Sequence, residues 1–259
     1  MPKTYLDNIL AWHRSRSAND PRELSQLIDE AMACAPTRGF ASALRNTPHL
    51  AVIAEIKRRS PSKGDLNASL DPEALAAKYQ LGGASCLSVL TDSEHFGGSV
   101  SDLQLARNAC SLPVIRKDFT VDRKDICDAR IMGADCVLLI AAALTEAEMR
   151  DFLTLAQSID IDALVEVHDE KELETAVNAG AFLIGVNQRD LVTFQVDQER
   201  AVRLAARIPS SCIKVAESGV RGRADAVALR QAGYHAVLVG EHLVTSQNPS
   251  AAITELCVD

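Results

Sequence analysis

The sequence lacks the long apolar runs that membrane-spanning helices need. No segment approaches the ~18–20 consecutive apolar residues that cross a bilayer. The N-terminus also carries no basic segment followed by an apolar one, as a secretory signal would. We therefore expect no membrane partner and a cytoplasmic location.

Metal-binding and redox motifs are missing as well. The seven cysteines are scattered and none belongs to a Cys-x-x-Cys pair, and the six histidines show neither His-x-x-x-His nor His-Glu-x-x-His spacing. Scattered cysteines within apolar segments are typical of buried thiols in a reducing compartment. The sequence therefore predicts no metal site and no redox motif.

An excess of positive charge is also absent, because the formal net charge is −8. Surfaces that bind nucleic acids irrespective of sequence usually carry a basic excess, so we expect no nucleic-acid partner. A small anion can still bind, since a local cluster of cations overrides the charge of the whole molecule.

From residue 50 onward, short apolar runs alternate with segments of helical periodicity. The apolar runs cover residues 51–57, 84–90, 113–117, 135–140, 161–167, 182–187, 211–217 and 235–240. The helical segments cover residues 72–81, 99–109, 122–132, 145–158, 169–179, 197–207, 221–231 and 248–257. A doubly wound open sheet shares this alternation, but it usually has fewer strands, and no Gly-x-Gly-x-x-Gly motif occurs. We therefore predict an α/β fold of the closed (β/α)8 TIM-barrel type.

Glycine marks the ends of several predicted helices. Gly82, Gly133, Gly180 and Gly233 each follow a helical segment and precede an apolar run. This is the C′ position, which favours glycine because its backbone is often left-handed. We expect all four glycines to end helices in this way.

Residues 1–48 stand apart from the repeat. The spacing of apolar groups predicts helices within 5–13 and 21–34, and Pro36, Gly39 and Pro48 indicate irregular chain or a short helix after them. We predict an N-terminal helical extension, residues 1–48, packed on a catalytic barrel formed by residues 49–259.

Charged side chains gather at the carboxyl ends of the predicted strands, where the active sites of TIM barrels lie. Glu55 and Lys57 are two residues apart and share one face of an extended chain, where burial is costly unless they pair or react. The other strand ends supply Arg116, Lys117, Asp118, Glu166, Asn187, Gln188, Arg189, Glu217, Ser218, Gly240 and Glu241. A single charge at a strand end is most often solvated or structurally paired. Convergence from six strands on one rim indicates acid–base chemistry without a metal.

A phosphate site is predicted on separate grounds. In barrels of this type, phosphate commonly binds between the loops after the seventh and eighth strands. Ser218-Gly219 and Gly240-Glu241 fall at those places, and Ser60 and Lys57 come from the first strand, which adjoins the eighth. Each dipeptide alone is also an ordinary turn. No Gly-Lys-Ser/Thr occurs, which excludes a Walker-type phosphate loop.

Seven short motifs lie at or near these strand ends. They read Glu55-Ile-Lys57, Ser60-Pro61-Ser62-Lys63-Gly64, Phe96-Gly97-Gly98-Ser99, Arg116-Lys117-Asp118-Phe119, Glu166-Val-His168, Asn187-Gln188-Arg189-Asp190-Leu191 and Glu217-Ser218-Gly219. In this order, and over nearly the whole chain, they resemble the indole-3-glycerol phosphate synthase family of tryptophan biosynthesis. The family usually has asparagine where this chain has Gln188, a change that we expect to be tolerated.

The resemblance implies ring closure of 1-(2-carboxyphenylamino)-1-deoxyribulose 5-phosphate, with loss of CO2 and water, to give indole-3-glycerol phosphate. It implies Lys117 as the general acid at the developing alkoxide, and Lys57 as the lysine that holds the substrate carboxylate and shares proton delivery. It implies Glu166 as an acid in the dehydration step. Glu55 would orient lysine or hydroxyl groups, and Asn187 and Glu217 would position substrate hydroxyls or the catalytic lysine. No cofactor is expected, because ring closure itself places charge where CO2 can leave.

The resemblance also assigns the binding residues. Ser60, Ser218, Gly219 and Gly240, with Glu241 beside them, would line the phosphate site. Arg189 would bind the anionic end of the ligand or order the neighbouring network. An apolar wall around the anthranilate ring would consist of Phe96, Phe119, Leu138, Leu191 and Leu238. For Leu138 and Leu238, core packing is nearly as good an explanation.

Two other functions fit the same scaffold. One is another phosphate-binding barrel isomerase or lyase, which would not be expected to combine the Glu55-x-Lys57 and Arg116–Phe119 motifs. The other is a non-catalytic binder of phosphoribosyl ligands, which would have lost the acid–base residues. The expected partner is a phosphorylated small molecule, and we expect a monomer, with a weak dimer as the alternative.

Overall fold

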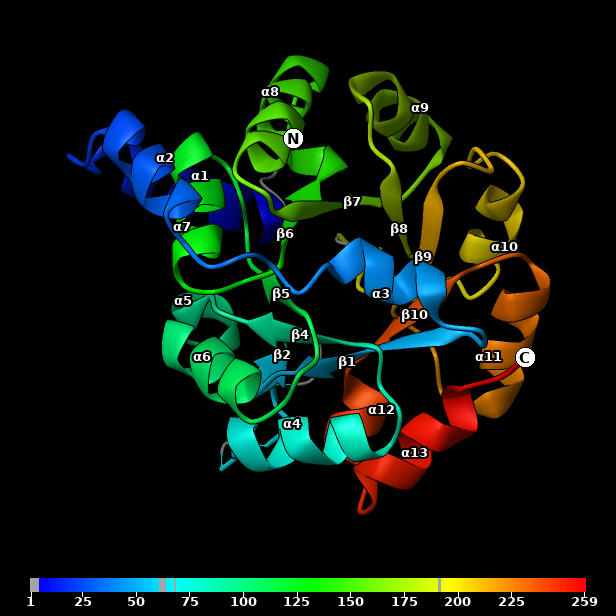
Figure 1. Cartoon of the computed structure of the whole chain (residues 1–259). Coiled ribbons are helices and arrows are strands. Elements are labelled where there is room, and N and C mark those ends of the chain that lie inside the picture. The colour runs from blue at the N-terminus through cyan, green and yellow to red at the C-terminus, as the bar shows by residue number, and fades with distance from the viewer. Residues whose placement is uncertain (1–4, 61–63, 68, 191) are drawn as a thin grey trace.

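Eight parallel strands form a closed barrel. The computed structural model describes residues 5–60, 64–67, 69–190 and 192–259. In chain order the barrel strands are β1 (Ala51–Ile56), β4 (Cys86–Leu90), β5 (Val114–Lys117), β6 (Cys136–Ile140), β7 (Asp162–Val167), β8 (Leu183–Asn187), β9 (Ile213–Glu217) and β10 (Ala236–Val239). β1 pairs with β4 on one side and with β10 on the other, which closes the sheet. The prediction of a (β/α)8 TIM barrel is confirmed (Figure 1).

Helices surround the barrel and alternate with its strands along the chain (Figure 1). They are α4 (Pro72–Leu81), α6 (Val100–Asn108), α7 (Arg123–Ile131), α8 (Glu146–Ser158), α9 (Glu170–Ala179), α10 (Arg200–Ala205), α11 (Arg223–Gln231) and α13 (Pro249–Leu256). Local signals start several of them: Asp71 caps α4, and Asp122 and Thr145 form capping boxes at α7 and α8. None of the helices in the described ranges is long and apolar enough to cross a membrane.

The barrel strands are buried on both faces. Every residue of β1, β4, β6 and β8 is buried, because one face packs inside the barrel and the other against the helices. This is the reason that the strands read as continuous apolar runs, and it makes each polar residue in them conspicuous.

Short elements follow the carboxyl ends of several strands. They are the antiparallel pair β2 (Arg59–Ser60) and β3 (Gly64–Asp65), the helices α5 (Ser93–Phe96) and α12 (Glu241–Val244), and the 3-10 turn η1 (Ala141–Ala143). They build the rim of the barrel at the end where the polar strand ends converge.

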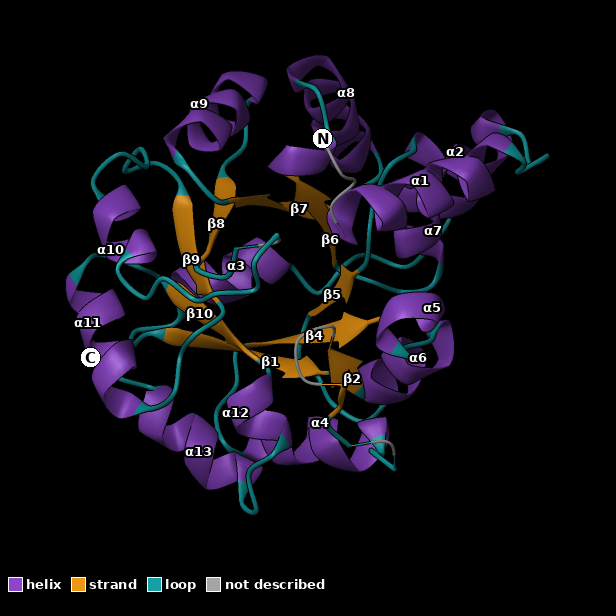
Figure 2. Cartoon of the chain, turned by 180° about the vertical axis from the view of Figure 1, so that it is seen from behind, coloured by secondary structure: helices purple, strands orange, loops and turns teal. Residues whose placement is uncertain are grey.

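The first 48 residues contribute α1 (Tyr5–Ala18), α2 (Leu24–Met32) and α3 (Phe40–Asn46) (Figure 2). α3 lies at the amino ends of the strands, where the Ala41 N–H donates to the first residue of β7, Asp162. α1 reaches the opposite end, where the Arg14 guanidinium donates to the Ala143 carbonyl in η1 at 2.8 Å. The extension therefore touches both ends of the barrel. Its division from the barrel at residue 48 stays a prediction.

One of the four helix-ending glycines differs from expectation. Gly133, Gly180 and Gly233 have positive φ angles, whereas Gly82 has a φ of −73° and Gly83 takes the left-handed place at +93°. A Cβ on Gly82 would lie 2.6 Å from the Ser250 carbonyl oxygen, so this glycine serves the close packing of α13 against α4.

The end of the chain is fastened to the start of the barrel. The Leu50 N–H, just before β1, donates to the Val258 carbonyl at 2.7 Å. The C-terminal residues thereby pair with the segment that leads into the first strand.

Candidate active site

A cavity of about 690 Å³ opens at the carboxyl ends of the strands. All of the site residues proposed from the sequence that the structure describes line it: Glu55, Lys57, Ser60, Phe96, Lys117, Phe119, Leu138, Glu166, Asn187, Arg189, Glu217, Ser218, Gly219, Leu238, Gly240 and Glu241. Leu191, the remaining residue, lies outside the described ranges. The barrel thus brings together residues that are up to 186 positions apart, from Glu55 to Glu241.

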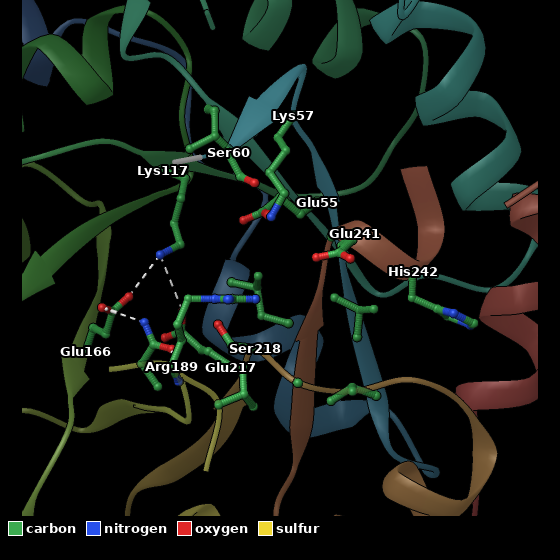
Figure 3. A pocket seen from close by; sticks show the side chains of 18 of the residues that line it. Glu55, Lys57, Ser60, Lys117, Glu166, Arg189, Glu217, Ser218, Glu241 and His242 are labelled. Atoms are coloured by element: carbon green, nitrogen blue, oxygen red, sulfur yellow. Dashed lines mark hydrogen bonds and ion pairs between the residues drawn. The ribbon is translucent and has the colours of Figure 1, made fainter. Parts of the chain in front are cut away.

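The ammonium group of Lys117 lies between two buried carboxylates (Figure 3). Lys117 is the last residue of β5, and its Nζ is 2.9 Å from Oε2 of Glu166 on β7 and 3.4 Å from Oε2 of Glu217 on β9. The Asn187 side-chain amide donates to the other oxygen of Glu166 at 3.0 Å. One cation is therefore held over two acids from different strands.

The pKa values of these three groups move in different directions. Burial alone would lower the pKa of Lys117, but the carboxylates around it outweigh burial and hold that pKa above its usual value. Burial would raise the pKa of Glu166, but Lys117, His168 and Asn187 hold it well below its usual value. For Glu217 burial prevails and, with Glu166 beside it, raises the pKa to about 8. At neutral pH the resting cavity therefore contains an ammonium, a carboxylate and a protonated acid.

Glu55 and Lys57 form the charged pair expected from their spacing. The Lys57 Nζ is 2.6 Å from Oε1 of Glu55, and both groups face the cavity (Figure 3). Gly240 makes room for them, because a Cβ there would lie 2.2 Å from the same Glu55 oxygen and 2.9 Å from the Lys57 Nζ. The adjacency of β1 and β10 thus places the pair against the loop that follows the last strand.

The phosphate end of the predicted site lies in the same cavity. Ser218 and Gly219 have φ angles of +65° and +76°, so the chain turns sharply after β9 and exposes backbone groups to the cavity. The Gln188 amide donates to the Ser218 carbonyl at 2.7 Å, and the Gln198 amide donates to the Gly219 carbonyl at 2.7 Å. Gln188, the departure from the family pattern, therefore supports this turn. The Ser60 hydroxyl is buried and has no hydrogen-bond partner among the described residues.

Arg189 follows β8 at the edge of the cavity. Its backbone N–H donates to the Asn187 side chain at 3.0 Å, and its guanidinium donates to the Phe194 carbonyl at 3.1 Å. It is therefore tied both to the end of β8 and to the loop after it.

Apolar side chains form one wall. The rings of Phe96 and Phe119 lie 6.1 Å apart between centroids, and the buried side chains of Leu138 and Leu238 also line the cavity. The sequence did not single out several further lining residues, namely Leu90, Ile140, Phe194, Val196, Gln198, Arg221, His242 and Thr245. Leu90 and Ile140 end their strands and could have been found by that position, whereas Phe194 and Val196 lie in a loop without a periodic signal.

One group of side chains among the described residues has the composition of a metal site: His13, Asp92 and His95. His13 Nε2 and His95 Nδ1 lie 2.9 and 3.1 Å from the same Asp92 oxygen, while the other oxygen caps α5. Hydrogen bonds therefore account for these contacts. The cluster joins α1 to α5, whose last residue, Phe96, lines the cavity.

Comparisons with known proteins identify the family of this chain. The family model for indole-3-glycerol phosphate synthase matches residues 6–256. Indole-3-glycerol phosphate synthase 2 of Streptomyces coelicolor is 50% identical over 91% of this chain and 91% of its own length. The indole-3-glycerol phosphate synthase of Mycobacterium tuberculosis is 48% identical over 98% and 94%.

Solved structures with little sequence similarity share the fold. A 3-hexulose-6-phosphate synthase superposes with a TM-score of 0.63 at 17% identity, covering 80% of this chain and 98% of that one. The thiamine phosphate pyrophosphorylase from Pyrococcus furiosus gives 0.59 at 17% identity, covering 82% and 95%. The family match over nearly the whole chain is the decisive finding: this chain belongs to the indole-3-glycerol phosphate synthase family.

Proposed function

We propose a division of roles among the cavity residues for the reaction that this chain catalyses as a carbon–carbon lyase of tryptophan biosynthesis. The reaction closes a ring in 1-(2-carboxyphenylamino)-1-deoxyribulose 5-phosphate, with loss of CO2 and water, to give indole-3-glycerol phosphate. The observation that carries the proposal is the Lys117 ammonium between the side chains of Glu166 and Glu217, in one cavity with the turn at Ser218 and Gly219.

Lys117 is the general acid of ring closure. When the aromatic carbon attacks the ketone, the carbonyl oxygen becomes an alkoxide, which needs a proton or a cation. Lys117 is protonated in the resting cavity because its carboxylate neighbours raise its pKa, so it can supply both. The C–CO2 bond then breaks, and its electron pair neutralises the iminium formed during attack.

Lys57 holds the substrate carboxylate until CO2 departs and shares proton delivery with Lys117. Glu55, 2.6 Å from its ammonium, orients it. A cation held at one position favours ring closure because the carboxylate is bound in the geometry needed for attack.

Glu166 is the acid that protonates the departing hydroxyl. Asn187 and Lys117 hold its two oxygens in fixed positions, and Glu217 positions Lys117 from the other side. After ring closure, Lys117 is a neutral amine, and it takes back the proton that the ring carbon loses as the indole forms. Lys117 therefore gives one proton and receives one.

Binding residues complete the assignment. The phosphate binds at Ser60, Ser218, Gly219, Gly240 and Glu241, and Arg189 binds the anionic end or orders the loop beside it. The apolar wall formed by Phe96, Phe119, Leu138 and Leu238, together with Leu191, receives the anthranilate ring. We further propose that residues 1–48 form an extension of a catalytic barrel, residues 49–259. We propose that the protein is a cytoplasmic monomer, that its partner is a free phosphorylated small molecule, and that it does not bind nucleic acid.

The assignment is tested by incubating the purified protein with the carboxyphenylamino-deoxyribulose phosphate and following indole fluorescence. Lys117→Ala should abolish turnover while retaining affinity for the analogue in which the ketone is reduced to an alcohol. Lys171→Ala, an exposed lysine on α9, is the matched control and should behave like the parent.

Two results would overturn the assignment. If Lys117→Ala keeps turnover within about threefold of the parent, a change of only ~0.65 kcal/mol in the barrier, Lys117 is not the acid. If the parent binds the analogue but makes no product, the chain is a non-catalytic binder or acts on a different phosphorylated substrate.

A further inference from the structure

His168 lies between two carboxylates at the edge of the catalytic cluster. It follows β7 two residues after Glu166, so the two side chains leave the strand on the same side. Its Nδ1 is hydrogen-bonded to Oε2 of Glu172 on α9 at 3.0 Å, and its Nε2 is 3.4 Å from Oε1 of Glu166, an ion-pair distance without hydrogen-bond geometry. The same Glu172 oxygen also accepts the His168 backbone N–H at 2.8 Å, which fixes the imidazole at one end.

This setting favours the doubly protonated ring. A neutral imidazole has one lone pair, which would here face a carboxylate, whereas the imidazolium presents an N–H to each acid. Burial would lower the pKa of His168, but Glu166 and Glu172 outweigh it and raise that pKa to about 10. The charged groups around it are Glu166 on β7 and Glu172 on α9; the Lys117 ammonium and the protonated Glu217 lie beyond Glu166.

The reaction consumes one proton in each turnover. The alkoxide takes one proton and the departing hydroxyl takes another, while the ring carbon gives one up. In the roles proposed above, Lys117 gives and regains its proton, so the net proton must pass through Glu166. Yet Glu166 is ionised in the resting cavity and its side chain is only 2% exposed, so it needs a neighbour to supply that proton. Glu217 also holds a proton at neutral pH, but its side chain is likewise only 2% exposed, whereas that of His168 is 12% exposed, so His168 is the neighbour closer to solvent.

We propose that His168, held by Glu172, is a positioning residue that orients Glu166 and supplies it with the proton consumed in each turnover. The trigger is the first chemical step. Once Lys117 has given its proton to the alkoxide, Glu166 loses its main counter-charge in a buried site, and its affinity for a proton rises. The ring then closes the 3.4 Å gap, the Nε2 proton of His168 moves to Oε1 of Glu166, and the N–H electron pair stays on the ring.

A proton from solvent returns His168 to its starting state. Glu166 passes its proton to the leaving hydroxyl, which departs as water, and a solvent proton returns to Nε2 of His168. The His168 side chain is 12% exposed, against 2% for Glu166, but its Nε2 atom is buried. The return of the proton therefore requires a small movement of the ring that brings Nε2 to solvent. This inference rests on the proposed role of Glu166 and deepens it.

The test uses His168→Asn, which can still hydrogen-bond but cannot supply a proton. We expect kcat to fall by roughly ten- to a hundredfold, with KM within about twofold, because the lost step follows binding. In the parent, kcat should fall at alkaline pH as His168 loses its proton, and this limb should be absent from the variant. Imidazolium buffer should restore part of kcat in His168→Ala, in proportion to the concentration of its acid form.

Controls separate this proposal from others. His49→Asn, at the opposite end of the barrel, should leave the pH profile unchanged. Glu172→Gln keeps the shape but removes the carboxylate, so the alkaline limb should move to lower pH; this variant serves if His168→Asn fails to fold. If kcat falls in His168→Asn but the alkaline limb stays and imidazolium does not restore activity, proton supply by His168 is wrong. A parent without turnover would instead overturn the function assigned to the cavity.

Discussion

Glu166 and Glu217 face the same ammonium, yet the pKa of Glu166 is lowered and that of Glu217 is raised. Glu166 receives additional partners from Asn187 and His168, whereas Oε1 of Glu217 is buried without a hydrogen-bond donor among the described residues. Burial therefore raises the pKa of Glu217 to about 8 and makes it the acid that holds a proton at neutral pH. The difference lies in the number of donors around each carboxylate.

This asymmetry predicts a pH-dependent effect of Glu217→Gln on stability. Because the folded pKa of Glu217 lies above the unfolded value, the folded parent holds the extra proton and loses stability as the pH rises from about 4.5 to about 8. Glutamine removes that loss. The free energy of unfolding of the variant relative to the parent, measured in urea, should therefore increase between pH 5 and pH 9. Glu174→Gln, an exposed substitution on α9, should show no such trend, and a similar trend in both variants would refute the assignment.

Gly185 on β8 leaves the space that the Glu217 carboxylate occupies. A Cβ at this position would lie 2.0 Å from Oε1 of Glu217 and 3.3 Å from Cδ1 of Leu164. Gly185→Ala should therefore push the Glu217 carboxylate away from Lys117 and reduce kcat by about tenfold or more, a barrier increase of at least ~1.4 kcal/mol. Steady-state kinetics measure this, with Gly222→Ala as control, since a Cβ there meets nothing within 4 Å. Unchanged kcat in Gly185→Ala would mean that the position of Glu217 does not limit turnover.

At the scale of elements, α1 supports the aromatic wall through one buried side chain. His13 is 1% exposed, and its Nε2 lies 2.9 Å from the Asp92 carboxylate that caps α5. Its ring also lies 5.3 Å from that of Phe119. The helix thus contacts the residues that carry the wall without lining the cavity itself.

Replacing this contact should weaken substrate binding more than chemistry. His13→Ala removes a buried hydrogen bond to a charged group, worth about 1.5–3 kcal/mol, and leaves a space beside Phe119. We expect KM to rise severalfold with kcat within about threefold of the parent, and α1 to become more sensitive to limited proteolysis. Ser15→Ala, exposed on the same helix, is the control. A fall in kcat at constant KM would instead place His13 in the chemistry.

At the scale of the whole molecule, local patterns were enough to predict the eight strands, most helices and the rim. Apolar runs, caps such as Asp71 and polar strand ends such as Glu166 are encoded within a few residues. A parallel barrel then brings every carboxyl end to one side, which places Lys117 near Glu217 without further information. The rim positions of the strand-end residues could be predicted because they depend only on strand order.

What the sequence did not indicate depends on packing between distant segments. Phe194 and Val196 enter the cavity from a loop without periodicity, and His13 meets Asp92 across 79 positions. Gly82 and Gly83 both follow α4 directly, so the sequence does not show which of them takes the left-handed backbone and which packs against Ser250. Such contacts need the assembled fold.

The pairing of the first and last strands has a consequence for synthesis of the chain. β1 leaves the ribosome early but lacks its β10 neighbour, and Leu50 lacks its partner Val258, until almost the whole chain has been made. Its open edge is meanwhile able to pair with other extended segments. Gly240 reaches Glu55 and Lys57 only when the barrel closes, so a nascent chain cannot assemble the complete cavity before its final strand emerges. Ligand binding by a nascent chain should therefore be detectable only after β10 has joined β1 and the barrel has closed.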